Sequence, residues 1–480
     1  MAGSFPRGTF SGGPTGREAD RPARGPGRAR AEALRILLRV GEEGAWASRL
    51  LESLDEQKLD PRDLALVHEI VLGVLRWRGF LDRRLRALCD RPIDRLDPPV
   101  REALRMAAYQ VILLDRIPSH AAVDESVSLV RSSVGRSAAG FVNAVLRRLS
   151  KENESRPEER PGLGAERTPR ALAAALSHPE WMVRRALGRF GPEETRSLLL
   201  ANNAPATVTL RPNPLHAAHT GLAARLETEG VRTAEGGLAP GALRVVSGNP
   251  VRTDLFREGA FWVQDEASQI VPLLFPPPWG GLTADLCAAP GGKTFVLATG
   301  TSGRVVAFDI HLHRCARLLA GVRRIIGGNI TGASRIAIVV GDLASAPPIA
   351  DGAFDRALVD APCSGTGVLR RHPEIRWRLA PGHLQDLASL QGRLLDTAWR
   401  ALKPGGWIVY SVCSLEPEEG EQVVAAFAAR SGCRMADPRA HLPEGARRII
   451  GEDGFLRTFP HRHGTDGFFA ALLRKPAAIG

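Results

Sequence analysis

The chain has 480 residues, 44% of them apolar, so it can bury two or more sizeable cores and is expected to form two to three domains. Its formal net charge of +12 makes a polyanion such as RNA the first partner to consider, although a GC-rich genome that favours Arg predicts the same excess. No apolar run reaches the roughly 18 residues of a membrane span, and the six cysteines contain no C-x-x-C pair, so we expect a protein of the reducing cytoplasm without a metal site.

The first 150 residues divide into a tail and a helical region. Residues 1–27 are rich in Gly, Pro and Arg and hold too few apolar side chains to offset the entropy lost on ordering, which predicts a disordered basic tail. Over residues 28–150 apolar residues recur at helical spacing, as at Val67, Ile70 and Val71, and strand patterns are almost absent. This region is therefore predicted to be an all-helical domain.

One helix of this region is expected to start after Pro118. Ser119 is placed to cap that helix with its hydroxyl, and His120 to pack or hydrogen-bond at the helix start. Further along, several arginines are candidates for contact with RNA phosphates, with plain solvated surface as the alternative: Arg131, Arg136, Arg147 and Arg148.

Residues 151–170 are charged and rich in proline, which predicts a linker. The following residues, 171–270, are predicted to form a small helical and α+β segment. Its expected strands lie at 206–211, 243–246 and 260–269. In the last of these, Phe261 and Trp262 either stack on a nucleobase or fill a core.

From residue 271 to 480 strand and helix patterns alternate, which predicts a mostly parallel, doubly wound sheet of the Rossmann-like kind. The expected strands are 282–287, 305–308, 336–340, 356–359, 407–410 and a return strand at 468–473, with helices near 312–326 and 383–402. Ligands of such sheets bind at the carboxyl ends of the strands.

The first strand ends in a turn of small residues, Cys-Ala-Ala-Pro-Gly-Gly-Lys-Thr, that leads into a helix. Gly291 and Gly292 are expected to let the backbone approach a ligand at the helix N-terminus. The spacing fits neither the G-x-G-x-x-G of dinucleotide sites nor a P-loop, so hydride transfer and nucleotide hydrolysis are disfavoured.

Acids end the next three strands: Asp309, Asp342 and Asp360. An acid at the second strand is placed to reach a ribose hydroxyl. Three acids in order fit a ligand with ribose, adenine and an ammonium group better than a triphosphate. Helix capping explains one or two of them, but is a weaker explanation for all three.

Two cysteines follow strand ends, Cys363 after the fourth strand and Cys413 after the fifth. A lone cysteine there is usually a small buried hydrophobe. A nucleophilic thiol needs a helix N-terminus, a cation or substrate contact to favour the thiolate. Both cysteines precede helical patterns, which we expect to supply that bias.

The motifs of both halves carry a resemblance to known families. Residues 108–125 and 140–149 resemble the NusB family of helical RNA-binding domains, in the form fused to ribosomal RNA methyltransferases. The C-terminal half resembles the RsmB/NSUN family of RNA 5-methylcytosine methyltransferases, and with the first half it is similar to the bacterial RsmB branch. The segments that carry this second resemblance are 284–294, Asp309, 341–342, 360–367, 370–374 and Cys413-Ser414.

This resemblance spans about residues 29–475 and implies an all-α NusB-like domain before an α/β class I methyltransferase domain. It implies S-adenosylmethionine as methyl donor, no metal, small-subunit ribosomal RNA as partner, and a monomer without a membrane anchor. The implied S-adenosylmethionine site includes Cys287, Ala288, Ala289, Pro290, Gly291, Gly292 and Lys293.

The remaining site residues take their roles from the same resemblance. Asp309 would hold the ribose hydroxyls, Asp342 would lie by the adenine, and Asp360 would lie between the methionine portion and the target base. Cys413 would be the covalent nucleophile and Cys363 would assist product release. Ser411-Val412 precede Cys413, where the family more often has a threonine directly before the cysteine.

Two other functions compete with this hypothesis. One is an RNA-binding assembly or antitermination factor whose methyltransferase fold is not catalytic. The other is methylation of an adenine amino group, which needs no thiol and usually has a proline-rich aromatic turn where Asp360-Ala-Pro-Cys363 stands. The cofactor acids and the two cysteines disfavour both.

Overall fold

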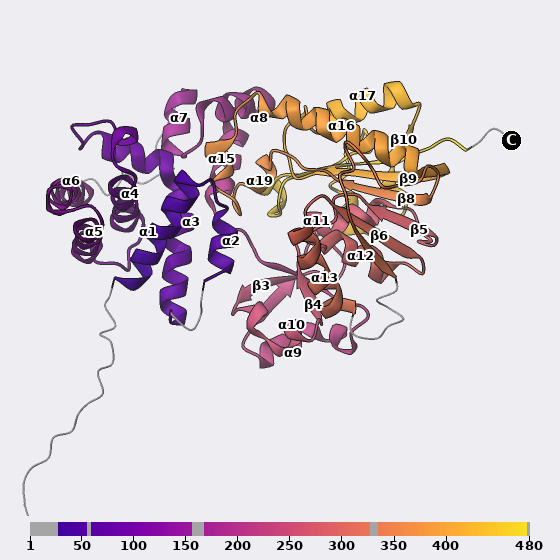
Figure 1. Ribbon diagram of the computed structural model, residues 1–480, viewed down its shortest axis with the longest axis horizontal. Helices are drawn as coiled ribbons and strands as arrows, with labels where there is room; N and C mark the ends of the chain where they lie inside the picture. Colours follow the sequence, from indigo (N-terminus) through magenta and orange to yellow (C-terminus); the bar gives the residue numbers. More distant parts are fainter. Residues whose placement is uncertain (1–26, 55–58, 156–167, 327–334, 478–480) are drawn as a thin grey trace, which may run out of the picture.

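The computed structural model describes residues 27–54, 59–155, 168–326 and 335–477. These residues form a helical part at one end, a small sheet beside it, and a larger α/β part at the other end (Figure 1). The predicted tail lies outside the described residues except for Gly27. Of the predicted linker, 156–167 also lie outside them, whereas 151–155 continue a helix.

The N-terminal part is helical throughout its described residues, which confirms the predicted all-α fold. Its α-helices are α1 Arg28–Glu42, α2 Ala47–Glu52, α3 Pro61–Arg86, α4 Pro98–Leu113, α5 Ser119–Ser133 and α6 Arg136–Ser155. Helix α3 begins at a strong start signal, because the carboxylate of Asp60 accepts the backbone N–H of Arg62 at 2.9 Å and of Asp63 at 2.8 Å. The apolar faces of these helices close on one core around Phe80, Leu104 and Leu146.

The start of α5 differs from its prediction. Pro118 occupies the N-cap position and Ser119 is the first helical residue, so no side chain caps this helix. His120 is exposed. The predictions of a Ser119 cap and a packed His120 are therefore wrong.

The middle region begins with two helices, α7 Pro169–Ala175 and α8 Glu180–Asn203. Helix α8 is kinked at Gly191, whose φ of 74° is left-handed, immediately before Pro192. A four-stranded antiparallel sheet follows, with strand order β2-β3-β1-β4. Its elements are β1 Thr209–Pro212, α9 Leu222–Thr228, β2 Arg232–Glu235, β3 Leu243–Ser247, α10 Asp254–Arg257 and β4 Phe261–Val263.

The predicted strand at 260–269 is only partly correct. Strand β4 ends at Val263, and Asp265 caps the short helix α11, Glu266–Ile270, by accepting the N–H of Ala267 at 3.0 Å. Phe261 is 0% exposed and Trp262 is 2% exposed. These two aromatic residues therefore fill cores and do not offer a surface for stacking on a base.

The C-terminal part is a mixed sheet of order β10-β12-β9-β8-β5-β6-β7, with β11 paired to β12. Strands β9, β8, β5, β6 and β7 are parallel, and β12 joins β9 in antiparallel pairing. The strands are β5 Leu282–Asp285, β6 Arg304–Asp309, β7 Ile336–Val340, β8 Phe354–Asp360, β9 Leu402–Val412, β10 Arg434–Ala436, β11 Leu456–Thr458 and β12 Phe468–Arg474. The α-helices are α12 Gly292–Gly300, α13 Leu312–Ile326, α15 Ile375–Arg378, α16 His383–Ala401, α17 Glu421–Ser431, α18 Glu444–Arg447 and α19 Pro460–His463.

Helices cover both faces of this sheet, as predicted for a doubly wound fold (Figure 1). Leu358 of β8 packs in the core with α12 and α13, whereas its neighbours Ala357 and Val359 pack in the core with α16 and α17. The strand order reverses between β5 and β8, because the chain continues from β5 to β6 and β7 on one side and returns to β8 on the other. The carboxyl ends of β5 and β8 therefore border the crevice in which such sheets bind ligands.

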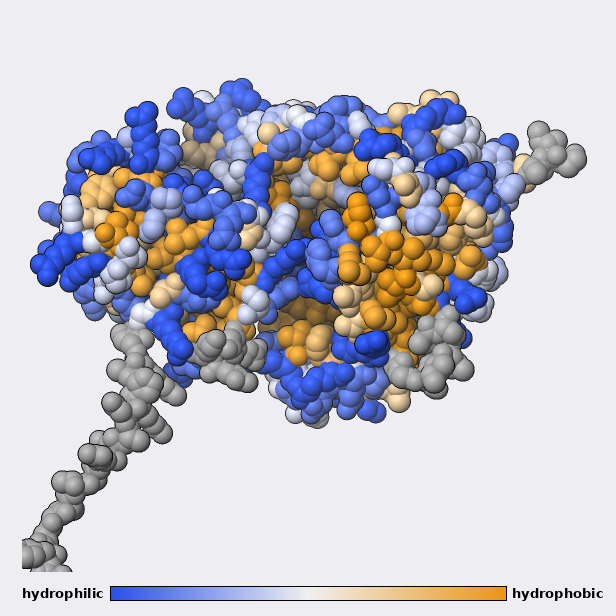
Figure 2. All heavy atoms as spheres, in the orientation of Figure 1, coloured by the Kyte–Doolittle hydropathy of each residue, from blue (hydrophilic) through white to orange (hydrophobic). Residues whose placement is uncertain are grey.

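The surface is uneven on the face shown in Figure 2, which is hollowed between the helical part and the α/β part. Apolar side chains gather on the α/β part of this face. Two exposed apolar residues, Ile310 and Leu312, lie just before α13 and at its first position. None of the described helices combines the length and the apolar character needed to cross a bilayer.

Candidate active site

A cavity of about 260 Å³ lies at the carboxyl ends of β5, β6, β7 and β8. Its walls come from the turn after β5, from the ends of β6 and β8 with the residues that follow them, from the turn after β7, and from α16. Three of the predicted acids line it together, Asp309, Asp342 and Asp360. The other lining residues are Leu286, Cys287, Ala289, Ile310, Arg314, Gly341, Leu343, Ala344, Ala361, Pro362, Leu390 and Leu394.

The turn after β5 contributes less to this cavity than its sequence indicates. Cys287 and Ala289 line it, but Ala288, Pro290 and the Gly291-Gly292-Lys293 run do not. Gly291 has a φ of 115°, and a Cβ at this position would lie 2.5 Å from Leu318 and 2.7 Å from Phe295. The left-handed backbone and the close packing of α12 and α13 both require glycine at this position.

Thr294, in the first turn of α12, points back to the end of β5. Thr294 Oγ1 donates to Asp285 Oδ2 at 2.7 Å, and burial raises the pKa of Asp285 to about 7. Burial also raises the pKa of the Cys287 thiol well above its ordinary value. A half-buried, protonated thiol at Cys287 fits a packing or binding role rather than a nucleophilic one.

Asp309 and Asp342 are each held by backbone N–H groups of the following turn. Asp309 is the last residue of β6, is buried, and accepts the N–H of His311 at 2.9 Å. Asp342 follows β7 after Gly341 and accepts the N–H of Ala344 at 2.9 Å, which lowers the pKa of its carboxyl. Both acids thus have fixed directions and a carboxylate facing the cavity.

Asp360, the last residue of β8, has both carboxylate oxygens engaged. Lys293 Nζ donates to Oδ2 at 2.6 Å, and Ser411 Oγ donates to Oδ1 at 2.7 Å. The Lys293 side chain is only 9% exposed and also lies 4.8 Å from the centre of the Phe468 ring. Lys293 therefore orients Asp360 from the turn rather than lining the cavity.

Cys363 and Cys413 lie side by side, with their Sγ atoms 3.0 Å apart. The hydrogen bond with Cys413, together with burial, raises the pKa of the Cys363 thiol well above its ordinary value. The predicted helix N-termini are not there: a short 3₁₀ turn, Thr366–Val368, follows Cys363, and α17 begins only at Glu421. The expected helical bias on these thiols is therefore wrong, because turns and Pro417 separate Cys413 from the next helix.

The Arg370-Arg371 pair anchors the loop that follows Cys363. Arg370 Nε donates to Asp466 at 3.1 Å, and Arg371 bridges Asp466 at 2.6 Å and Asp265 at 2.9 Å. These arginines join the start of α11, the loop before β12 and the cysteine loop. Their charges are paired with Asp265 and Asp466 within the protein, so these two arginines offer no free surface for RNA.

Sequence reasoning did not identify Glu419, which lies in the loop after Cys413. Its side chain is fully buried and accepts hydrogen bonds from Ser364 and Ser414, the residues that directly follow the two cysteines. The acidic run at 416–419 is a visible signal, but such a run usually marks solvated surface.

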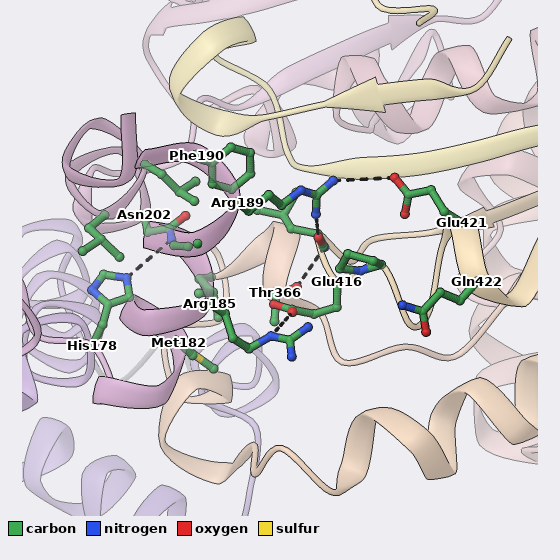
Figure 3. A pocket seen from close by; sticks show the side chains of 17 residues that line it. His178, Met182, Arg185, Arg189, Phe190, Asn202, Thr366, Glu416, Glu421 and Gln422 are labelled. Carbon is green, nitrogen blue, oxygen red and sulfur yellow. Dashed lines mark hydrogen bonds and ion pairs between the residues drawn. The ribbon is translucent and has the colours of Figure 1, made fainter. Parts of the chain in front are cut away.

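The outer side of this loop borders a second cavity, of about 580 Å³, between α8 and residues 415–422 (Figure 3). Arg185 of α8 donates to Glu416 at 2.7 Å and to Glu418 at 2.6 Å. Arg189 lies in the same row of the helix and donates to the carbonyl oxygen of Leu415. Helix α8 thus holds the loop from outside.

Comparison with known proteins follows the three structural parts. The model of the family described as 16S rRNA methyltransferase RsmB/F matches residues 274–474, the NusB family matches 27–151, and the ferredoxin-like domain of RsmF/B-like methyltransferases matches 178–252. The fold is similar to the crystal structure of PH0851, with a TM-score of 0.77 and 27% identity over 93% of this chain and 99% of that chain. A methyltransferase homolog protein from Pyrococcus horikoshii is similar over 63% of this chain and 97% of that one, with a TM-score of 0.53 and 26% identity.

Relatives match along nearly the whole chain. The ribosomal RNA small subunit methyltransferase B of Vibrio cholerae is 34% identical over 93% of this chain and 97% of that protein. The probable ribosomal RNA small subunit methyltransferase B of Bacillus subtilis is 32% identical over 92% of this chain and 98% of that protein. With its NusB-like helices, ferredoxin-like sheet and catalytic α/β domain in the same order, the chain belongs to the RsmB/F family of 16S rRNA methyltransferases.

Proposed function

We propose that this chain methylates carbon 5 of a cytosine in small-subunit ribosomal RNA, with S-adenosylmethionine as methyl donor and no metal. The observation that carries this proposal is the pair of thiols 3.0 Å apart, Cys363 and Cys413, on strand ends next to the cavity that contains Asp360. Methylation of an exocyclic amine or a ribose hydroxyl gives no use for two thiols. Carbon 5 of cytosine is a poor nucleophile, so its methylation requires a protein nucleophile that first adds covalently to the ring.

The cavity of about 260 Å³ fits the proposed donor by its chemistry. Asp309 would accept hydrogen bonds from the two ribose hydroxyls, and the turned carboxylate of Asp342 would lie by the adenine. The exposed side chain of Ile310 follows Asp309 and would pack on the adenine ring. When bound, S-adenosylmethionine supplies an electrophilic methyl group.

The protein side chains supply the remaining chemistry. The Cys413 thiolate would add to carbon 6 of the cytosine, which raises the electron density at carbon 5. Asp360, oriented by Lys293 and Ser411, would in its protonated form donate to the ring nitrogen 3 as the adduct forms. After methyl transfer, a base would remove the carbon 5 proton and Cys413 would leave as the thiolate, with Cys363 assisting this release.

The RNA would be held mainly by the N-terminal helical domain. Arginines of α5 and α6 are exposed and would contact phosphates: Arg131, Arg136, Arg147 and Arg148. The target cytosine must be unstacked before a thiol can reach its face, which favours a loop or a partly melted segment as substrate. We place the enzyme in the cytoplasm, where ribosomal RNA is assembled into subunits, and propose that it acts as a monomer.

Transfer of labelled methyl groups to small-subunit ribosomal RNA tests this proposal. The Cys413→Ala variant should lose transfer, while Cys433→Ala, at a half-buried thiol that precedes β10 and does not line the cavity, should keep it. Bisulfite sequencing of the product would locate the methylated cytosine. Full activity of Cys413→Ala would refute the thiol mechanism, and failure of the wild type to bind S-adenosylmethionine in calorimetry would instead favour a non-catalytic RNA-binding factor.

A further inference from the structure

Glu419 lies in the loop after β9 and has a fully buried carboxylate that accepts four hydrogen bonds. On Oε1 the donors are the backbone N–H of Ser364 at 2.7 Å and Gln391 Nε2 at 3.1 Å. On Oε2 the donors are the hydroxyls of Ser414, at 2.5 Å, and of Ser364. All four donors are neutral groups.

Three of these four donors belong to Ser364 and Ser414, the residues that directly follow the two cysteines of the proposed mechanism. Ser364 comes after Cys363 on the β8 side, and Ser414 comes after Cys413 on the β9 side. The two hydroxyls also lie 3.1 Å from each other, and Ser414 Oγ lies 3.2 Å from Thr366 Oγ1. One carboxylate therefore joins the two cysteine loops just beyond the last paired residues of their strands.

Glu419 is itself held firmly in place. Tyr410 Oη, buried in β9, donates to its carbonyl oxygen at 2.5 Å. Gln391 of α16 donates to Glu419 and also to the carbonyl oxygen of Pro362, the residue before Cys363. On the outside, Arg185 pairs with the neighbouring Glu416 and Glu418, so these acids face α8; Figure 3 shows Arg185 and Glu416. The Glu419 carboxylate instead points inward, towards Ser364 and Ser414.

Burying a carboxylate against neutral donors is costly, and a well-packed apolar residue would often stabilise such a site better. Here the carboxylate instead holds the two cysteine loops in one relative position. We infer that Glu419 is a positioning residue, which fixes the separation of the Cys363 and Cys413 thiols through Ser364 and Ser414. This inference rests on the proposed function for its catalytic consequence, but the geometry it concerns is measurable without methyl transfer.

The test compares Glu419→Ala and Glu419→Gln with Glu418→Ala, which removes the adjacent, outward-facing acid of the same loop. For Glu419→Ala we expect kcat to fall about 100-fold, the scale of a misplacement of about 1 Å. KM for S-adenosylmethionine should be unchanged, because Glu419 does not line the cofactor cavity. Glu419→Gln keeps Oε1 as an acceptor and its amide can donate to the serine oxygens, so it should restore most of the loss.

A second readout uses the thiols directly and needs neither RNA nor methyl donor. Diamide oxidises two adjacent thiols to a disulfide and is reduced to the hydrazine form by taking up both protons and both electrons. In the wild type and in Glu418→Ala, Cys363 and Cys413 should be crosslinked rapidly, as measured by mass spectrometry of the alkylated protein. In Glu419→Ala this crosslinking should slow, while Glu419→Gln should stay close to the wild type.

The outcomes separate the two proposals. Wild-type kcat and wild-type crosslinking in Glu419→Ala would overturn the positioning role. If Glu419→Ala slows the crosslinking but the wild type methylates no cytosine, the positioning role is supported and the proposed reaction is refuted. If Glu419→Ala does not fold, the double variant Ser364→Ala, Ser414→Ala removes the two hydroxyl donors to Glu419. An unchanged kcat and an unchanged crosslinking rate in that variant would equally overturn the inference.

Discussion

The sulfur atoms of Cys363 and Cys413 lie 3.0 Å apart because β8 and β9 are parallel neighbours whose ends are in register. Asp360 pairs with Ser411 at the last step of this ladder, and the two chains then turn together. The contact raises the pKa of Cys363, so this thiol stays protonated at neutral pH. A protonated thiol beside the proposed nucleophile fits a group that assists release rather than attack.

Replacement of Cys363 by Ala should separate the two steps of the proposed reaction. Adduct formation at Cys413 should continue, but release should slow, so the variant should accumulate a protein–RNA adduct that survives denaturant. Denaturing gel electrophoresis with labelled RNA measures this adduct, and the Cys363→Ala, Cys413→Ala double variant should lack it. Normal turnover without any adduct in Cys363→Ala would remove the release role.

Replacement of Asp309 by Ala should weaken S-adenosylmethionine binding. A hydrogen bond to a charged acceptor contributes about 1.5 to 3 kcal/mol, so Kd should rise about 10-fold to 100-fold in titration calorimetry. Asp309→Asn should bind with intermediate affinity, because its side-chain oxygen still accepts the His311 N–H. Asp254→Ala, at an exposed acid of α10, is the control. An unchanged Kd in Asp309→Ala would show that the ribose is held elsewhere.

Much of this site could be predicted because acids that end apolar strands mark the binding edge of a parallel sheet. Asp309 and Asp360 are the last residues of β6 and β8, and helix α13 has the predicted bounds. Strand order could not be predicted from the sequence in the same way. Only the reversal of order between β5 and β8 brings Lys293 to Asp360. The short antiparallel strands β10 and β11 were missed, since three residues carry too little periodicity.

Burial of charged residues was the main feature that sequence patterns did not predict. Glu419 stands in an acidic run and Arg376 in an arginine-rich one, and both composition signals indicate solvated surface. Each is 0% exposed in the structure, because segments distant in the sequence supply its hydrogen-bond partners. Periodicity within one segment contains no information about such partners.

Replacement of Asp285 by Asn should change how stability depends on pH. The pKa of this buried carboxyl is raised from 3.8 to about 7, so between these values the folded protein keeps a proton that the unfolded chain releases. The free energy of unfolding therefore has its full contribution from this group below pH 4 and loses it as the pH rises towards 7. At about 1.4 kcal/mol per pKa unit, Asp285→Asn should gain up to about 4 kcal/mol over the wild type between pH 4 and 8.

Urea unfolding at several pH values measures this difference, with Asp254→Asn at an exposed acid as the control. The difference between Asp285→Asn and the wild type should grow with pH. A constant difference across this range would mean that Asp285 is ionised in the folded protein at all these pH values.

Replacement of Arg376 by Ala should uncouple the N-terminal helices from the catalytic domain. This guanidinium is fully buried at the junction, and burial lowers its pKa to about 9. It donates to Ser177 O at 2.9 Å, Asn203 Oδ1 at 2.7 Å, Asn202 O at 3.2 Å and Arg76 O at 3.3 Å. Removing it takes a donor away from acceptors in α3, in the turn between α7 and α8, and at the end of α8.

Each buried acceptor left unpaired costs about 1 to 3 kcal/mol, so Arg376→Ala should lose at least about 3 kcal/mol and unfold at a lower urea concentration. Because α15 continues the loop that carries Cys363, kcat should fall as well, even where the variant is fully folded. Arg434→Ala, at an exposed arginine of β10, should change neither quantity. A catalytic domain that keeps its unfolding midpoint and kcat in Arg376→Ala would mean that the helical domain is only tethered, because a shared buried anchor must transmit its loss to both sides.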